Sequence, residues 1–271
     1  MKTSIVTVTY DKDLEFLKYN LKSIKKFCNG YHDNVVIIDD HENDCVETQR
    51  YLDSIGQKYF VNKEAKHVKR GYVRQQYIKL LCDLYVPDDT DYICHIDSDS
   101  IFKIEHTPEV YFIDSKPAIV KNNYELLVEK IKANEQTVKA FLRWKTLTSQ
   151  FLGWDVEYEF MFRMPLVYPY HLFKSIRTFL EEKHNASLLD LLKDLPVISE
   201  YNLLGAYAYK MMHDEFTWID RHENQEIALG LHKDLIGHYS SRKQQQPARY
   251  VDLSIPNNAL SQIIDDPARI S

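Results

Sequence analysis

The chain has 271 residues, of which 44% are hydrophobic and 27% are charged, and its formal net charge is −6. This composition is typical of a folded globular protein and excludes a largely disordered chain. The negative net charge argues against a general nucleic-acid binder, because phosphate contacts require a surplus of Lys and Arg.

The cysteines and the N-terminus favour a cytoplasmic protein. The four cysteines have no Cys-x-x-Cys spacing, so we expect reduced thiols. The N-terminus enters a strand pattern directly, without the apolar segment of a signal peptide, and no run approaches the ~18 apolar residues that span a membrane. We therefore expect a cytoplasmic protein without a transmembrane segment, and the length fits a single α/β domain over residues 1–271.

The first hundred residues alternate between strand and helix patterns. A β-branched run at residues 4–10 is typical of a central parallel strand, and apolar residues at helical spacing follow until Asn29 and Gly30. We then expect a strand at 35–38, a helix at 46–52, a strand at 59–61, a helix at 71–85 that Pro87 ends, and a strand at 92–96. Such β-α-β units build parallel sheets, whose ligands bind at the carboxyl ends of the strands.

Two carboxylates, Asp97 and Asp99, directly follow the strand expected at 92–96. Carboxylates held close together at the edge of a core repel each other, so a bound cation would stabilise the arrangement. Oxygen ligands favour Mg²⁺ or Mn²⁺ over Zn²⁺, and Mg²⁺ commonly shares its shell with substrate phosphates. The pattern therefore predicts a metal site for a nucleotide diphosphate, and the alternative is a polar turn whose side chains cap backbone amides.

The regular alternation loosens in the second half. We expect a strand at 118–120, a helix at 124–147, a strand-like aromatic segment at 151–164, helices within 171–195, a helix that Ser199 opens, and a strand at 216–219. The tail at 244–271 retains apolar residues, and we expect it to pack on the domain.

Trp154 and its acidic neighbours could bind an acceptor sugar. A flat apolar ring at Trp154 beside Asp155 and Glu157 suits a sugar face and its hydroxyl groups. The alternative is a core hairpin with one buried Trp.

Four stretches in order resemble the nucleotide-binding half of GT-A-fold glycosyltransferases, including uncharacterised bacterial and viral branches. They are the opening strand at 5–10, the acid-tipped strand at 35–44, the helix at 71–79 with Arg74-Gln75, and Asp97-Ser98-Asp99, which matches the family's Asp-x-Asp. The second stretch departs from the family pattern, because His41 and Glu42 replace its Gly and Ser. The resemblance implies a Rossmann-like, mostly parallel sheet flanked by helices in residues 1–115, and a mixed acceptor-side half in residues 116–243.

The resemblance also implies roles for individual residues. The nucleotide-binding candidates are Thr9, Tyr10, Asp39, Asp40, Arg74, Ser98, Arg242 and Lys243. Asp97 and Asp99 would hold Mn²⁺ or Mg²⁺ with a late histidine, for which His238 is preferred over His232 and His213. Asp39 and Asp40 could instead cap a helix, Arg74 could lie on a solvated helix face, and residues 235–243 could form an ordinary surface loop.

By its position after the acceptor region, Glu200 resembles the acid that serves as base in inverting members of this fold, and Asp155 is the second choice. An inverting transfer needs a carboxylate that takes the acceptor's hydroxyl proton. The alternative for Glu200 is a residue favoured in the first turn of a helix by the helix dipole.

The function predicted by this resemblance is metal-dependent transfer of a sugar from a nucleotide diphosphate, UDP by family habit, to a hydroxyl of a glycan or other acceptor. One rival is a phosphohydrolase of the haloacid dehalogenase type, although that family has its Asp-x-Asp on the first strand. The other is a nucleotide- or carbohydrate-binding module without chemistry. The donor sugar, the acceptor and the stereochemistry depend on the shape of the pocket.

Overall fold

The computed structural model describes residues 1–40, 45–105, 107–161, 165–224 and, as backbone, 236–238. The predictions for His232, Arg242, Lys243 and the tail at 244–271 lie outside these residues. In the described part of the chain, no helix is both long and apolar enough to cross a membrane.

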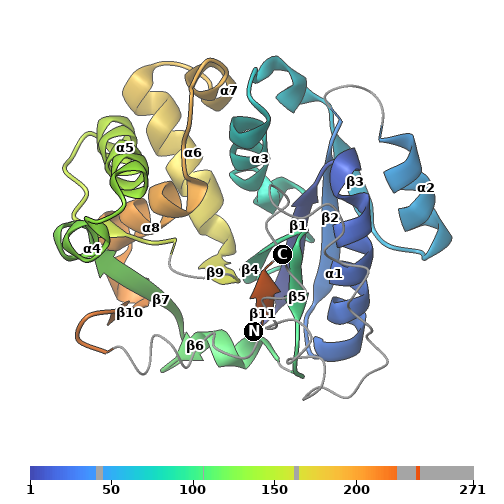
Figure 1. Ribbon diagram of the computed structural model, residues 1–271. Coiled ribbons are helices and arrows are strands. Elements are labelled where there is room, and N and C mark those ends of the chain that lie inside the picture. Colours follow the sequence, from blue (N-terminus) through green and yellow to red (C-terminus); the bar gives the residue numbers. More distant parts are fainter. Residues whose placement is uncertain (41–44, 106, 162–164, 225–235, 239–271) are drawn as a thin grey trace.

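The first half forms a mixed α/β unit in which strands and helices alternate (Figure 1). Its strands are β1 (Thr3–Thr9), β2 (Asp33–Asp39), β3 (Tyr59–Asn62), β4 (Tyr92–Asp97) and β5 (Ser100–Phe102). Its helices are α1 (Leu14–Phe27), α2 (Val46–Ser54) and α3 (Gly71–Lys79). The strands predicted at 4–10, 35–38, 59–61 and 92–96 are confirmed.

The main sheet has five strands in the order β3-β2-β1-β4-β9, where β9 is Leu166–Pro169. The first four strands are parallel, and β9 runs antiparallel to β4. The register pairs Thr9 with Ile38 and Val8 with Asp97. The carboxyl ends of β1, β2 and β4 therefore meet at one edge of the sheet.

Helices cover both faces of this sheet, which explains its continuous apolar strands. Side chains alternate along a strand, so Val6 packs in the cluster that contains residues of α3, whereas Ile5 packs in the cluster of α1. The strand pattern in the sequence thus predicts a sheet buried on both sides, and the structure has one.

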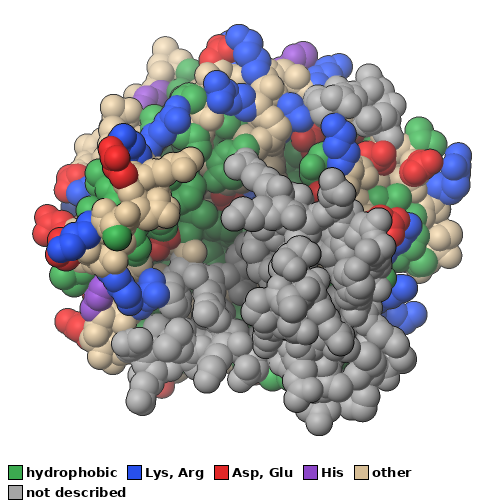
Figure 2. Space-filling model, viewed as in Figure 1, with side chains coloured by type: hydrophobic (Ala, Val, Ile, Leu, Met, Phe, Trp, Pro, Cys, Tyr) green, Lys and Arg blue, Asp and Glu red, His purple; other side chains and the backbone are tan. Residues whose placement is uncertain are grey.

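The second half adds a smaller sheet and a group of helices. The sheet has the order β10-β7-β6, with β8 also paired to β7. Its strands are β6 (Phe112–Ile113), β7 (Lys116–Asn123), β8 (Tyr158–Glu159) and β10 (Thr217–Asp220). The helices are α4 (Tyr124–Ile131), α5 (Glu135–Leu152), α6 (Tyr170–His184), α7 (Leu188–Leu192) and α8 (Glu200–Met211). Figure 2 shows hydrophobic side chains gathered in a hollow in the region of α6 and α8.

Three predicted elements are wrong in their extent. The helix expected at 71–85 ends at Lys79, and a short 3-10 helix, Cys82–Leu84, follows it. Arg177 of α6 donates a hydrogen bond of 2.7 Å to the carbonyl of Leu80, and this tertiary contact binds a carbonyl at the end of the helix. Leu84, in this 3-10 helix, is 63% exposed.

The strand-like segment expected at 151–164 is also wrong for most of its described length. Helix α5 continues to Leu152, and Gly153 ends it with a φ of 80°, which favours glycine. Only Tyr158–Glu159 forms a strand there. The single helix expected at 124–147 is two helices, because Asn134 caps a new helix by accepting from the amide of Thr137 at 3.1 Å.

Candidate active site

The turn between β4 and β5 carries Asp97, Ser98 and Asp99 at the carboxyl edge of the sheet. Asn20 of α1, which is fully buried, donates to the carbonyls of Ser100 at 2.8 Å and Asp97 at 3.3 Å. One helix side chain therefore braces both ends of the turn, and the sequence pattern alone gave no indication of this contact.

Asp13, which was not among the site residues predicted from the sequence, joins this turn. The hydroxyl of Ser98 donates to Asp13 Oδ2 at 3.1 Å. Burial raises the pKa of Asp99 to about 8, and the nearby carboxylates of Asp97 and Asp13 add to the rise. Burial also raises the pKa of Asp13 to about 6, with Asp97 adding to the rise and the Ser98 hydrogen bond opposing it. Carboxylates are thus crowded around Asp99.

Lys79 faces Asp97 from the interior. Its ammonium lies 2.6 Å from Asp97 Oδ1 and 2.8 Å from Glu200 Oε1. Burial lowers the pKa of Lys79, but Asp97 and Glu200 outweigh burial and raise it well above its usual value. Lys79 is therefore a cation in the protein interior, and the sequence pattern indicated no role for it.

The nucleotide-binding candidates of β1 and β2 lie at the same edge. Thr9 is buried and Tyr10 is 37% exposed. Arg74 Nε donates to Asp39 Oδ2 at 2.9 Å, and both side chains are largely buried. The structure thus brings two candidates together as an ion pair, and the solvated-face alternative for Arg74 is wrong. Asp40 is also buried.

The acceptor candidates lie on the segment between α5 and β8. Asp155 is exposed, and its Oδ1 lies 3.5 Å from the ammonium of Lys145 of α5. Trp154 packs on Phe179 of α6 with a ring separation of 5.6 Å, and Glu157 is exposed. None of these contacts reaches Asp97 or Asp99, and the acceptor roles stay predictions.

Glu200 begins α8, as expected, behind the cap residue Ser199, whose hydroxyl accepts from the amide of Asn202 at 3.2 Å. Its side chain is only 1% exposed. Burial raises the pKa of Glu200, and the ammonium of Lys79 opposes that rise. The role of Glu200 as base stays a prediction, because its observed partner is a lysine.

Of the predicted histidine ligands, His213 stacks on Trp218 with a ring separation of 5.7 Å. The backbone of His238 lies in β11 (Ile236–His238), which pairs antiparallel with β5 and places His238 opposite Ser100. Within the residues that the structure describes, no three His, Cys, Asp or Glu side chains converge closely enough to hold a metal ion.

A search of solved structures finds this architecture in a galactosyltransferase. The crystal structure of galactosyltransferase LgtC, in complex with donor and acceptor sugar analogs, matches with a TM-score of 0.50 and 13% sequence identity. The match covers 96% of this chain and 95% of that chain. No protein-family model and no curated protein sequence matches the chain. At this identity the likeness establishes the fold, which is the GT-A type expected from the sequence.

Proposed function

We propose that this protein is a metal-dependent glycosyltransferase that moves a sugar from a nucleotide diphosphate, UDP in the first instance, to a hydroxyl of an acceptor. The observation that carries the proposal is the Asp97-Ser98-Asp99 turn at the carboxyl edge of a parallel sheet in a GT-A fold. In open α/β sheets, ligands bind at this edge.

The chemistry of the turn fits a hard divalent cation. Asp97 and Asp99 offer carboxylate oxygens, the ligands that Mg²⁺ and Mn²⁺ prefer. Burial raises the pKa of Asp99 first, and the nearby carboxylates of Asp97 and Asp13 add a repulsion that a bound cation would relieve. The strand pairing of β11 brings the backbone of His238 beside the turn, which supports His238 as a further ligand. When bound, the ion would stabilise the diphosphate as it leaves.

The side chains around the turn would bind and orient the donor. Asp39 and Arg74 form one pair at the end of β2, beside which the base and ribose would lie. In the transfer itself, the acceptor oxygen forms a bond to the anomeric carbon while the bond to the diphosphate breaks. In an inverting transfer, a carboxylate takes the hydroxyl proton.

The position of the carboxylates argues against the phosphohydrolase alternative. Asp97 and Asp99 follow β4 and not the first strand. Asp11 and Asp13 do follow β1, but Asp11 accepts from Thr48 at 2.8 Å and Asp13 accepts from Ser98.

A thermal-shift panel of nucleoside diphosphates and nucleotide sugars, with and without Mn²⁺, tests the proposal. A ligand that binds only the folded state adds about 2.7 kcal/mol at a hundred times its Kd. We expect UDP or a UDP-sugar to raise Tm strongly only with Mn²⁺. Asp97→Ala and Asp99→Ala should abolish the Mn²⁺-dependent part of the shift.

Asp33→Ala is the matched control, because Asp33 lies at the amino end of β2 and pairs with Lys58 at 2.6 Å. This variant should keep the full shift. Full shifts in both Asp97→Ala and Asp99→Ala would contradict the metal assignment, and a wild-type protein that no nucleotide stabilises would contradict the proposed function.

A further inference from the structure

The ammonium of Lys79 lies at the junction of three elements. Lys79 is the last residue of α3, Asp97 is the last residue of β4, and Glu200 is the first residue of α8. The ammonium also approaches Tyr201, with 3.4 Å to its hydroxyl and 4.7 Å to the centre of its ring. One cation thus joins the nucleotide-binding half to the second half.

A buried ammonium is stable only when its charge is compensated. Lys79 is 4% exposed and has two carboxylate partners, so the three groups together carry an excess negative charge. Their exposure differs: Glu200 is 1% exposed, whereas Asp97 is 18% exposed. Asp97 is therefore the member of the cluster that also faces outward, to the Asp97-Ser98-Asp99 turn.

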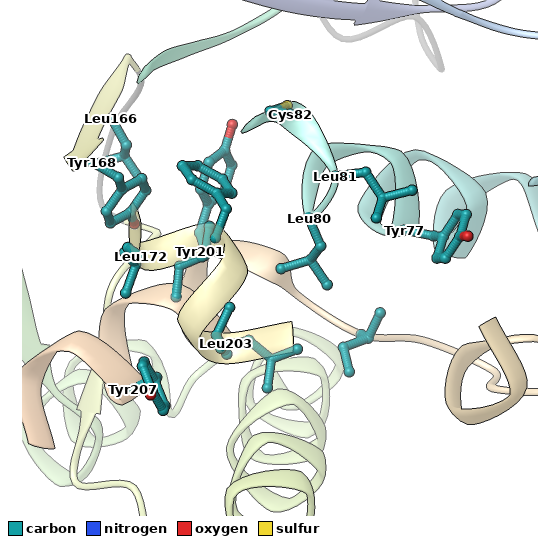
Figure 3. Close-up of a cluster of buried hydrophobic side chains, with 14 of the residues drawn as sticks. Tyr77, Leu80, Leu81, Cys82, Leu166, Tyr168, Leu172, Tyr201, Leu203 and Tyr207 are labelled. Carbon is teal, nitrogen blue, oxygen red and sulfur yellow. The ribbon is translucent and has the colours of Figure 1, made fainter. Parts of the chain in front are cut away.

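The surroundings hold this cluster in place. Gln76 of α3 accepts a hydrogen bond of 3.3 Å from the amide of Glu200, and Ser199 caps the first turn of α8. Figure 3 shows Tyr201 between Tyr168 on one side and the chain around Cys82 on the other. Lys79 and Glu200 consequently have little freedom to move away from Asp97.

We propose that Lys79 is a positioning residue: it binds one oxygen of Asp97 from the interior and so presents the other oxygen to the metal ion. Glu200 is the counter-ion that holds Lys79 in place, in contrast to the role of base predicted from the sequence. This inference rests on the proposed function, because it concerns the same metal site. Groups that orient a metal ligand from behind typically change metal affinity 10- to 100-fold when they are removed.

The test is the affinity for Mn²⁺ alone, measured by titration calorimetry and by electron paramagnetic resonance. Lys79→Met should weaken Mn²⁺ binding about 10- to 100-fold. Glu200→Gln should weaken Mn²⁺ binding less than Lys79→Met does, because Lys79 keeps its ion pair with Asp97. If Lys79→Met binds Mn²⁺ as well as wild type, Lys79 does not position Asp97.

Arg177→Met is the matched control for the loss of an enclosed ion pair. Arg177 of α6 binds Asp83, which is only 3% exposed, with 2.7 Å between Nη2 and Oδ2. This pair does not include Asp97, so Mn²⁺ affinity should equal that of wild type. If Arg177→Met and Lys79→Met lose Mn²⁺ affinity equally, the loss reflects general destabilisation, and the inference is overturned.

A second variant covers the case in which Lys79→Met does not fold. The double variant with Lys79→Met and Glu200→Gln removes the carboxylate of Glu200 together with the ammonium that it pairs with. This variant should show the same loss of Mn²⁺ affinity.

The rate of sugar transfer then separates the two roles of Glu200, because loss of a general base typically lowers the rate 10²- to 10⁴-fold. Such a loss in Glu200→Gln with unchanged Mn²⁺ affinity would make Glu200 the base. Failure of wild type to bind Mn²⁺ would instead refute the metal site itself.

Discussion

Two buried glutamates in the second half have opposite surroundings. Glu200, at the start of α8, is 1% exposed and lies 2.8 Å from the ammonium of Lys79. Glu159, at the end of β8, is 2% exposed and accepts from the backbone amide of Met161 at 2.6 Å. Glu200 thus lies against a cation, whereas Glu159 accepts hydrogen bonds from neutral donors and Arg221 has only the smallest of the effects on its pKa.

Burial raises the pKa of both carboxyl groups, but the groups that oppose the rise differ. Burial raises the pKa of Glu159 to about 7, and hydrogen bonds from Met161 and Asn122, together with the charge of Arg221, offset only part of that rise. At Glu200, burial acts in the same direction, but the adjacent ammonium opposes it directly. A pKa raised by burial therefore does not by itself mark a functional acid, and the two sites differ in the partner that opposes the rise.

The largest expected effect on the free energy of unfolding comes from removing the ammonium of Lys79. Lys79→Met leaves Asp97 and Glu200 without their shared partner, and breaking a buried pair in this way costs about 3–5 kcal/mol. Urea denaturation should show this loss in the free energy of unfolding. Adding Glu200→Met should recover part of it, because the second change removes an uncompensated buried charge. A single variant as stable as wild type would contradict this account of the cluster.

An intermediate effect on stability is expected from replacing Glu159, and its size depends on pH. Its folded-state pKa of about 7 lies above the ordinary glutamate value of 4.5, so the folded state holds the proton more tightly and stability falls as pH rises between these values. The shift corresponds to about 3 kcal/mol. Glu159→Gln should remove this dependence, so its stability relative to wild type should increase from pH 4 to pH 8.

Denaturation with urea at several pH values measures this difference. Glu182→Gln, which changes an exposed glutamate of α6, is the control and should leave the profile as in wild type. Parallel profiles for wild type and Glu159→Gln would mean that Glu159 does not contribute to the pH dependence.

The smallest expected effect on stability is that of Asp155, the exposed alternative base. Its side chain is 80% exposed and 3.5 Å from Lys145, and such surface pairs contribute at most about 1 kcal/mol. Asp155→Asn should therefore change the free energy of unfolding by less than about 0.5 kcal/mol. A fall in turnover of 10²-fold or more in this stable variant would identify Asp155 as the base, and unchanged turnover would remove it from the candidates.

Local patterns predicted the elements that position the site. The apolar runs before Asp39 and Asp97 predicted parallel strands, and parallel strands bring their carboxyl ends to one edge. The capping residue Ser199 also predicted the start of α8. By contrast, the glycine after Leu152 is a usable signal for the end of α5, but the aromatic residues around it favoured a strand, and that prediction was wrong.

In the first half, the sequence by itself determined the order of strands and helices, the buried sheet and the place of Asp97 and Asp99 at its edge, because these follow from side-chain periodicity along short segments. Only the tertiary structure decided which charges meet. Lys79, Asp97 and Glu200 come from three separate elements, and Asp13 reaches Ser98 from a different segment of the chain. The reason is physical: periodicity reports which face of a segment is apolar, whereas the partner of a buried charge depends on how distant segments pack.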